Sequence, residues 1–544
     1  MAMQERTRTK GGTSNKKRYP CPNCKEGYLH KDGRTAGGKQ RWSCKTGGSS
    51  GGRRVVCYTT TDPNSPVPLD QAGRAKTAAK NPQFRKALGG IQRFLITTAQ
   101  NSTPVHEGFW NAMEAYCKKT GAELVVIPIR YKNPTSRWTA SQRNEEFWHI
   151  PSDALYNQRK KLNDNLVLLG DIKTIPTAER PLSGFEGVSH GESCIIGHPK
   201  LQLQTIPSPQ NRMPKLLTTT GACTVPNYTD SKAGKKGEFH HTLGACVIEI
   251  QGKTFHMRQA SACKDGSFID GDTEYLPDGT HRAAPPALGL VMGDTHARFA
   301  DETVLEATFG ASGICDWIKP SALVWHDLLD GYAVNPHHRD DPFIALAKHR
   351  AGFADIRAEV EFTVDFLARY TGDRKSIVVA SNHNDFLNRW MRRSDWRTDP
   401  VNAGFYLETA KLMAESARMD SAGASTLDPF AHWVEELLPV GPDVRCLSYD
   451  ESYMLGDIEC GFHGDKGPNG ARGTVGNLKR LGVRLITGHG HSPAIEEGHF
   501  RNGTSTGLKL EYTTGPSSWL NTHCAIYGNS KRSLLNIIDG SFQL

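Results

Sequence analysis

The stretch Ala287-Leu-Gly-Leu-Val-Met-Gly-Asp-Thr-His296 decides how this 544-residue chain is interpreted. Its first six residues form an apolar run of strand length, and a polar cluster follows directly. Two more runs have this form: Ser376–Ala380 precedes Ser381-Asn382-His383-Asn384, and Val483–Thr487 precedes Gly488-His489-Gly490-His491. Because active sites of α/β sheets lie at the carboxyl ends of strands, the pattern predicts an α/β fold with a site assembled from these clusters.

Two further polar clusters occur in the same part of the chain, His326-Asp327-Leu328-Leu329-Asp330 and Gly461-Phe462-His463-Gly464. Each cluster alone is a weak signal, since an Asp-x-His after a strand is often a turn with a surface histidine, and the His326–Asp330 cluster could cap a helix. Together the five clusters offer about seven carboxylate, amide and imidazole ligands, which suit Mn²⁺, Fe²⁺ or Zn²⁺. That number exceeds what one metal needs and fits two.

The order of the clusters, D-x-H, G-D-x-x-D, G-N-H-[DE], H and G-H-x-H, resembles that of the calcineurin-like metallophosphoesterases over residues 287–544. The resemblance implies a four-layer β-sandwich flanked by helices. It also implies a centre of two divalent metal ions, with Mn favoured and Fe, Zn or Mg as alternatives. One metal would be held by Asp294, His296 and His491 and the second by Asn382, His463 and His489, with Asp327 bridging both and His383 beside the scissile phosphate as the catalytic non-ligand histidine.

Three positions depart from the family pattern, one of them Ser381, which stands where the third motif begins with a glycine. His326 stands where the family has a glycine before the bridging aspartate, and Asn384 where it has an acidic residue after the catalytic histidine. None of the implied ligands is lost, so we expect an active centre. The orientation of His383 is open, because Asp385 could replace the missing acidic residue. Asp330 is expected to order the second loop rather than to bind metal.

The front of the chain carries the only cysteines, among 13, that look organised. Cys21-Pro-Asn-Cys24 and Arg41-Trp-Ser-Cys44 resemble most of a zinc ribbon, but the second knuckle is irregular. His30 is an alternative fourth ligand, and the competing interpretation is a set of free thiols in a basic arm. We predict one structural zinc ion held by Cys21, Cys24, Cys44 and Cys57.

The net charge of +9 is unevenly distributed. The first 100 residues hold 20 Lys and Arg against 5 Asp and Glu, an excess of 15, which leaves −6 for the remainder. A basic segment on a mildly acidic body indicates a polyanionic partner, although a solvated basic tail would have the same composition. We predict contacts with DNA phosphates at Lys16, Lys17, Arg18, Lys39, Arg41, Arg53 and Arg54.

Four segments are predicted: a basic zinc-ribbon-like element (1–60), a linker with short basic helices (61–92), an accessory α/β or α+β domain (93–286) and the catalytic domain (287–544). The accessory segment opens with a strand-helix-strand pattern over 94–127. It suits substrate positioning or subunit contact, so a homo-oligomer formed through it is considered. No internal repeat is visible in the sequence.

Helical spacing of apolar residues is found at Asp341–Tyr370 and Val401–Arg418. The chain has no run of about 18 apolar residues, so no membrane span is expected. The polar and basic stretch Met1–Pro20 has no apolar core that would act as a signal peptide. We therefore expect a cytoplasmic protein, in the host cytoplasm if a phage encodes it.

The predicted metal centre and the basic front favour a Mn²⁺-dependent DNA nuclease in which a metal-activated water attacks the phosphodiester. The layout resembles phage-encoded DNA-degrading or DNA-transfer nucleases. One alternative is a phosphomonoesterase or nucleotide phosphatase with the same metals, for which an extended basic front would be superfluous. The other is a nucleic-acid-binding protein with an inactive phosphoesterase domain, against which the complete ligand set argues.

Overall fold

In the computed structural model, the described part of the chain comprises residues 90–129, 147, 150–151, 153–419, 427–510 and 513–544, with six short strands before residue 61. These strands are β1 (Tyr19–Pro20), β2 (Tyr28–Arg34), β3 (Gln40–Cys44), β4 (Gly47–Ser50), β5 (Arg53–Val55) and β6 (Tyr58–Thr60). β1, β2, β3 and β6 form an antiparallel sheet, and β4 pairs with β5. The predicted zinc ligands and phosphate contacts lie outside the described residues or have side chains outside the description: Cys21, Cys24, Cys44, Cys57, Lys16, Lys17, Arg18, Lys39, Arg41, Arg53 and Arg54.

A six-stranded sheet contains the apolar runs at residues 287–292 and 376–380. Its order is β22-β21-β20-β19-β28-β29, with β19 to β22 parallel and β28 and β29 antiparallel. The predicted strands at 287–292 and 376–380 are confirmed as β19 and β21. The bounds are β19 (Gly289–Val291), β20 (Ala322–Trp325), β21 (Lys375–Val378), β22 (Asp443–Cys446), β28 (Thr522–Ile526) and β29 (Arg532–Asn536).

Helices cover one face of this sheet, where Trp325, Val360 and Trp433 belong to one continuous core. The helical stretch predicted at 341–370 is two helices, because Gly352 adopts the left-handed conformation (φ 73°) and ends the first. The stretch predicted at 401–418 is confirmed. The helices are α3 (Glu302–Phe309), α4 (Ile314–Ile318), α5 (Pro342–Ala351), α6 (Ile356–Thr371), α7 (Asp385–Arg393), α8 (Ala403–Met419) and α9 (Pro429–Leu437).

The opposite face packs against a ten-stranded sheet of order β23-β24-β25-β27-β26-β12-β13-β11-β10-β9, through residues such as Val324, Ile377 and Ile486. This sheet combines strands from both sides of the predicted boundary at residue 287, since β12 pairs with β26. Its strands are β9 (Arg159–Asn163), β10 (Leu166–Leu169), β11 (Ser193–Ile196), β12 (Gln202–Ile206), β13 (Lys215–Thr219), β23 (Met454–Leu455), β24 (Ile458–Glu459), β25 (Arg484–Thr487), β26 (Ala494–Glu496) and β27 (His499–Arg501).

The strand-helix-strand pattern predicted at 94–127 is confirmed as parallel strands β7 and β8 joined by α1. They belong to a four-stranded sheet, β15-β14-β7-β8, which lies between α1 and the β9–β13 half of the ten-stranded sheet. A small sheet, β16-β17-β18, follows. The bounds are β7 (Ile91–Gln100), α1 (Glu107–Thr120), β8 (Glu123–Ile129), α2 (Lys232–Phe239), β14 (Gly244–Gln251), β15 (Thr254–Ser261), β16 (Phe268–Asp270), β17 (Thr273–Tyr275), β18 (His281–Ala283) and α10 (Val475–Leu478).

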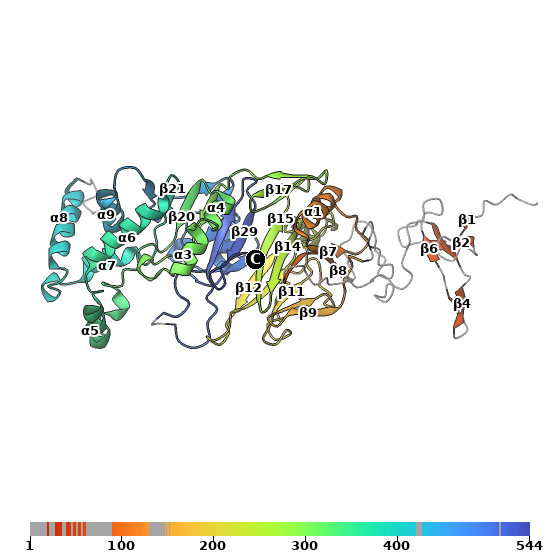
Figure 1. Ribbon diagram of the computed structural model, residues 1–544, viewed down its shortest axis with the longest axis horizontal. Coiled ribbons are helices and arrows are strands. Elements are labelled where there is room, and N and C mark those ends of the chain that lie inside the picture. The colour runs from red at the N-terminus through yellow and green to blue at the C-terminus, as the bar shows by residue number, and fades with distance from the viewer. Residues whose placement is uncertain are drawn as a thin grey trace, which may run out of the picture.

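The chain from residue 90 is therefore a mixed α/β fold with several mixed sheets. Figure 1 shows α6 to α9 at one end, α1 and β7 to β9 towards the other, and the C-terminus between them. At that junction β15 bonds to β29: Gln259 N donates to Ser533 Oγ (3.1 Å), and Leu534 N donates to Gln259 Oε1 (2.8 Å). The four-layer sandwich implied by the resemblance stays a prediction. Within the described residues, none of the helices combines the length and apolar character that crossing a bilayer requires.

Candidate metal centre

Three loops at one edge of the six-stranded sheet carry the first group of predicted site residues. Asp294 and His296 follow β19, Asp327 follows β20, and Asn382 and His383 follow β21. These strands are parallel, so their carboxyl ends share an edge. The sequence order of strand and polar cluster thus brings five side chains from three distant segments to one place.

The second group comes from the ten-stranded sheet that packs face to face with the first. His463 follows β24, and His489 and His491 follow β25. β24 and β25 are parallel neighbours, so these histidines also lie at one sheet edge. The predicted strand at 483–487 is confirmed as β25. The candidate centre therefore lies where the edges of two packed sheets meet.

Two buried carboxylates occupy the middle of this junction. Asp294 is fully buried, and its Oδ2 lies 3.1 Å from His491 Nε2. Asp327 Oδ2 lies 3.1 Å from His463 Nε2 and 3.8 Å from His296 Nε2. Asp327 thus belongs to two groups of close ligand atoms, one with His296 and His491 and one with Asp294 and His463. A shared carboxylate between two such groups is the arrangement that a metal-bridging residue requires.

Asn382 and His489 lie at the more exposed side of the centre. His489 Nδ1 is 3.0 Å from Asn382 Oδ1, and both side chains are half-buried. The backbone N–H of His489 also donates to Asp294 Oδ1 (3.0 Å). The loop after β25 is therefore tied both to the loop after β19 and to the loop after β21.

Four of the predicted ligands have left-handed backbone, which side chains other than glycine rarely adopt. The φ angles are 43° at His296, 44° at Asp327, 68° at His489 and 50° at His491. Such conformations cost about 1–3 kcal/mol each and concentrate at functional sites, where the surrounding structure imposes them. Their clustering here supports the prediction of a site at this junction independently of the side-chain types.

The charges of the cluster compensate one another. Burial by itself would raise the pKa of Asp294, but the hydrogen bond and charge of His491 outweigh it and lower that pKa to about 2. Burial would likewise lower the pKa of His463, yet the charge of Asp327 raises it to about 9. The cluster therefore holds protons at neutral pH that a divalent cation would displace on binding.

The donor set fits divalent metal ions, as the unpaired atoms indicate. Among the residues that the structure describes, Asp327 Oδ1, His491 Nδ1 and His326 Nε2 are buried and have no hydrogen-bond partner. A buried carboxylate oxygen without a partner costs free energy unless something else satisfies it. The clusters could hold metal ions, and oxygen and imidazole ligands in this number suit Mn²⁺, Fe²⁺ or Zn²⁺.

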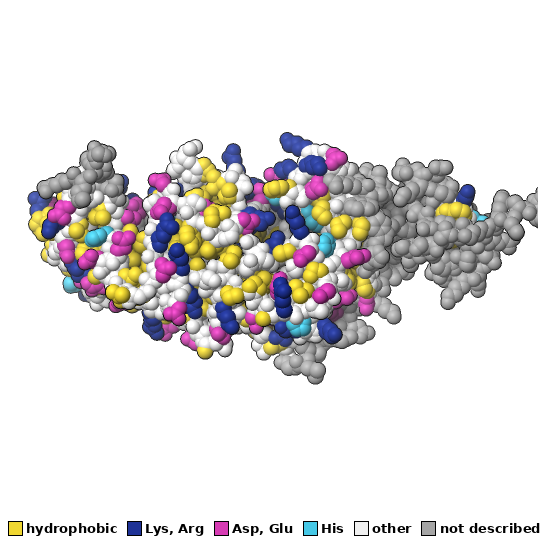
Figure 2. Space-filling model, turned by 90° about the horizontal axis from the view of Figure 1, so that it is seen from above, with side chains coloured by type: hydrophobic (Ala, Val, Ile, Leu, Met, Phe, Trp, Pro, Cys, Tyr) yellow, Lys and Arg dark blue, Asp and Glu magenta, His cyan; other side chains and the backbone are white. Residues whose placement is uncertain are grey.

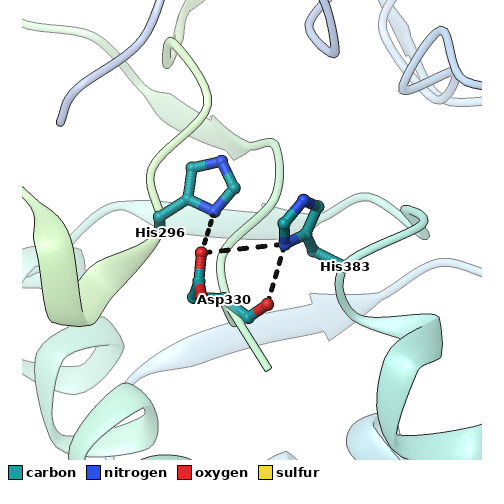
Figure 3. Close-up of side chains that lie close together, drawn as sticks. All are labelled: His296, Asp330 and His383. Atoms are coloured by element: carbon teal, nitrogen blue, oxygen red, sulfur yellow. Dashed lines mark hydrogen bonds and ion pairs between the residues drawn. The ribbon is translucent and has the colours of Figure 1, made fainter. Parts of the chain in front are cut away.

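Asp330 contacts the two histidines on either side of it (Figure 3). Its Oδ1 lies 2.8 Å from His296 Nδ1 and 3.7 Å from His383 Nδ1, and its carbonyl oxygen lies 2.7 Å from His383 Nδ1. The prediction that Asp330 orders its loop fits these contacts, and Asp330 also forms a third group of close ligand atoms with the two histidines. It fixes the ring orientation of a predicted ligand and of the predicted catalytic histidine at once.

Two of the residues that depart from the family pattern, Asn384 and His326, make contacts within the centre. Asn384 joins two loops of the centre, because its Oδ1 accepts from Leu329 N (3.0 Å). His326 is fully buried, with its Nδ1 3.4 Å from His463 Nδ1. Asp385 bonds to Asn388 Nδ2. The carboxylate nearest His383 is thus that of Asp330, and Asp385 does not take the place of the missing acidic residue among the described contacts.

Two further residues adjoin the centre without any motif that would have indicated them. Trp519, from the loop before β28, stacks edge-on against His491 with ring centroids 4.2 Å apart. Glu359 on α6 accepts from Tyr332 N (3.0 Å) and Ala333 N (2.9 Å), just after Asp330, and burial raises its pKa to about 7. Both depend on contacts between segments far apart in the chain.

No family model matches this sequence. The sequence is 30% identical over 502 residues to Protein A1 of Escherichia phage T5, a match that covers 87% of this chain and 88% of the phage protein. The chain belongs to the family of Protein A1.

The relationship to Protein A1 extends beyond the predicted catalytic segment, because a match over 87% of the chain is longer than residues 287–544. The A1 family therefore shares the α/β region that precedes the candidate centre as well. This region and the centre are best considered as parts of one family architecture.

Proposed function

We propose that this member of the A1 family is a metal-dependent phosphodiesterase, and specifically a Mn²⁺-dependent DNA nuclease. The observation that carries the proposal is the position of Asp327. Its carboxylate lies close enough to two separate groups of buried His and Asp to bind a metal ion together with either group. Supporting it is the resemblance of the five clusters to calcineurin-like metallophosphoesterases. We assign the same architecture, a β-sandwich flanked by helices, to residues 287–544.

In this proposal one ion is held by three ligands from β19 and β25, and the other by three from β21, β24 and β25. Two bound divalent cations supply Lewis-acid stabilisation of phosphate charge and a water of lowered pKa. The protein supplies the geometry, since each ligand is fixed by a strand end. The assignment is Asp294, His296 and His491 for the first ion, Asn382, His463 and His489 for the second, and Asp327 for both.

His383 is the proposed proton donor to the leaving oxygen. Its Nδ1 lies 2.7 Å from the Asp330 carbonyl oxygen, which can only accept, so Nδ1 carries a hydrogen. The remaining nitrogen, Nε2, is then the atom that exchanges a proton with the substrate.

DNA is the proposed substrate because the excess of basic residues lies in the first 100 residues. On the face that Figure 2 shows, by contrast, basic, acidic and apolar side chains are interspersed over the described residues. A basic segment bearing a structural zinc ion on Cys21, Cys24, Cys44 and Cys57 is proposed to hold the phosphate backbone. Since a relative belongs to a phage, we place the activity in the host cytoplasm.

The test offers purified protein with Mn²⁺ four substrates: supercoiled plasmid, linear duplex, single strand and a chromogenic phosphomonoester. Cleavage of DNA is expected. Cleavage of the monoester alone would instead support a phosphatase, and DNA binding without cleavage an inactive phosphoesterase domain.

Site variants separate the centre from the rest of the chain. Asp327→Ala and His383→Ala should each lower DNA cleavage by about 100-fold or more, since each removes a group that contacts the reacting phosphate or its metal. The matched controls are Asp365→Ala on α6 and His349→Ala on α5, whose side chains are exposed. Wild-type cleavage by Asp327→Ala would refute the assignment.

A further inference from the structure

The strand order of the ten-stranded sheet repeats itself outward from its centre. In one direction it runs β12-β13-β11-β10-β9, and in the other β26-β27-β25-β24-β23. From the centre outward, neighbouring strands pair antiparallel, parallel, parallel and antiparallel in both directions. The chain also visits the five strands in the same sequence order in both halves.

The second layer repeats in the same way. The four-stranded sheet has the order β15-β14-β7-β8, and the six-stranded sheet contains β29-β28-β19-β20. In both, the first two pairs are antiparallel and the last is parallel. A helix, α1 or α3, follows the corresponding strand β7 or β19. Residues 91–261 and 289–536 therefore share one topology over nine strands.

Individual backbone hydrogen bonds match as well. In the first half Cys223 N donates to Thr98 O (2.8 Å), and in the second Ser505 N donates to Asp294 O (2.8 Å). A second backbone bond also matches. The N–H of the residue that caps the following helix donates to the carbonyl oxygen of Cys223 in the first half (from His106, 2.8 Å) and of Ser505 in the second (from Asp301, 2.9 Å). Thr98 thus occupies the position of Asp294.

The two halves contact each other reciprocally, as copies related by a twofold axis do. β12 pairs antiparallel with β26, with Leu203 opposite Ile495. Lys200, after β11, bonds to Glu497 at the β26–β27 turn (2.9 Å). In the reverse direction Thr205 on β12 donates to the carbonyl oxygen of Pro493, after β25. The contact is that of a pair of subunits within one chain.

We propose that residues 91–261 are a metal-free copy of the unit formed by residues 289–536, so that the chain is a fused pair with a single metal centre. Gly197-His198-Pro199-Lys200 takes the place of Gly488-His489-Gly490-His491. A Cβ on Gly197 would lie 2.5 Å from Thr98 Oγ1, and one on Gly488 would lie 2.0 Å from Asp294 Oδ1. Thr98 and Lys200 hence replace two ligands: the Thr98 hydroxyl donates to Ile127 O (2.6 Å), and the Lys200 ammonium, which cannot bind a cation, pairs with Glu497 (2.9 Å).

The bridging carboxylate and the third cluster are also missing from the first copy. Four residues beyond the strand pairs Phe94–Glu123 and Leu290–Leu323 lie Thr98 and Ile127 in the first copy and Asp294 and Asp327 in the second. Ile127 therefore replaces the bridging aspartate. The segment between β8 and β9, residues 130–158, is also much shorter than its counterpart, residues 326–453, which contains the whole Asn382-His383 loop.

His198, the histidine of the first copy that lies at the position of His489, is engaged within the chain. His198 is fully buried, its Nε2 lies 2.9 Å from Ile175 O, and its Nδ1 accepts from Lys200 N (2.9 Å). Neither ring nitrogen is left to bind a metal ion. His198 thus keeps the position of His489 and has lost its ligand function.

The first copy still contributes to the centre of the second. Its β12–β13 turn bonds to the loop after Thr506 through Ser208 and Ser517, whose backbones exchange two hydrogen bonds of 2.9 Å. Gln210 Nε2 donates to Thr513 O in the same loop (2.6 Å). This loop carries Trp519 against the centre. The metal-free copy therefore acts as a built-in partner that holds a wall of the site.

The test counts metal in the full chain and rests on the proposed metal centre, not on its substrate. Protein saturated with Mn²⁺ is desalted, and Mn per chain is measured by elemental analysis and by titration. Two Mn per chain are expected for wild type and for His198→Asn, and a loss of Mn for His489→Asn. Circular dichroism establishes that each variant is folded.

Four Mn per chain, or a loss of Mn in His198→Asn with retention in His489→Asn, would overturn the inference. Should wild type bind two Mn and cleave none of the four substrates, the nuclease proposal would fail while the single-centre inference stands. Absence of any Mn from wild type would refute both.

Discussion

Gly488→Ala is the sharpest single test of the candidate centre, because its effect follows from one distance. A Cβ at this position would lie 2.0 Å from Asp294 Oδ1 and 3.0 Å from His326 Cβ. Non-bonded heavy atoms approach to about 3.5 Å, so the Asp294 carboxylate would have to move by about 1.5 Å. Asp294 is fully buried and also accepts the N–H of His489 through Oδ1. It has no solvent into which it could turn.

The size of the effect follows from the precision that metals demand. Metal–ligand distances are held to about 0.2 Å, so a carboxylate displaced by about 1.5 Å no longer binds. A misplacement of about 1 Å costs roughly 100-fold in catalysis. We expect Mn²⁺ affinity and DNA cleavage each to fall by at least about 100-fold, which is about 2.7 kcal/mol. Overpacking should lower the free energy of unfolding by about 1–3 kcal/mol.

The assay is Mn²⁺ titration calorimetry, with cleavage of linear duplex DNA measured in parallel. The control is Gly404→Ala on α8, where a Cβ would meet no atom within 4 Å. The matched variant is Gly197→Ala, whose Cβ would lie 2.5 Å from Thr98 Oγ1. It should lower the melting temperature and leave two Mn per chain. A folded Gly488→Ala protein that binds Mn²⁺ like wild type would refute the reasoning.

Three further outcomes are expected. Asp330→Asn should weaken Mn²⁺ binding by about 10–100-fold, because the carboxylate that orients His296 is lost. Asp385→Asn, measured by the same Mn²⁺ titration, should bind like wild type. Equal affinities of the two variants would contradict the orienting role. The metal-free protein should lose stability, measured by urea unfolding, as the pH rises from about 6.5 to about 9. Buried carboxylates raise the pKa values of His296 and His463 to about 9, so over this range the folded protein releases protons that the unfolded chain has already lost. Mn²⁺-loaded protein should show no such decline. Arg258→Met should cost about 3–5 kcal/mol, because buried Asp270 loses its ion-pair partner and Glu249 keeps only its contacts with Arg93 and the Leu544 N–H. A melting temperature equal to that of wild type would contradict this.

The strands around the centre could be predicted because the signal is local. An apolar run such as 287–292 must be buried, and the polar cluster that follows it must lie at the strand's end. Parallel pairing then gathers the clusters within each sheet, whereas the meeting of the two sheets follows from their packing and could not be predicted from the runs alone. The helical stretch at 341–370 was less well predicted, because one glycine with positive φ, Gly352, ends the first helix within it.

The features that escaped prediction depend on contacts between distant segments. Trp519 reaches His491 only because its loop is held by the β12–β13 turn, and nothing in its own neighbourhood in the sequence indicates that. The repeat escaped for a different reason. Topology and backbone hydrogen bonds persist when side chains change, and the ligand positions changed most, as Thr98 and Ile127 illustrate. The residues that would have revealed a second copy are those that it lost.

The distribution of ligands over the two sheets explains why one copy could lose its metals and still be retained. The proposed centre takes its aspartates from one sheet and its last histidines from the other, so bound metal would add a link between two layers that also pack through Val324 and Ile486. In the first copy Ile127 and Ile195 pack between the corresponding layers. On the proposed repeat, the first copy needs no metal to join its layers, and its strands β12 and β15 still bond to β26 and β29 of the second copy. The shared sheet thus gives the first copy a structural role that is independent of metal, and the proposed metal binding is confined to the copy whose loop after β21 supplies Asn382 and His383.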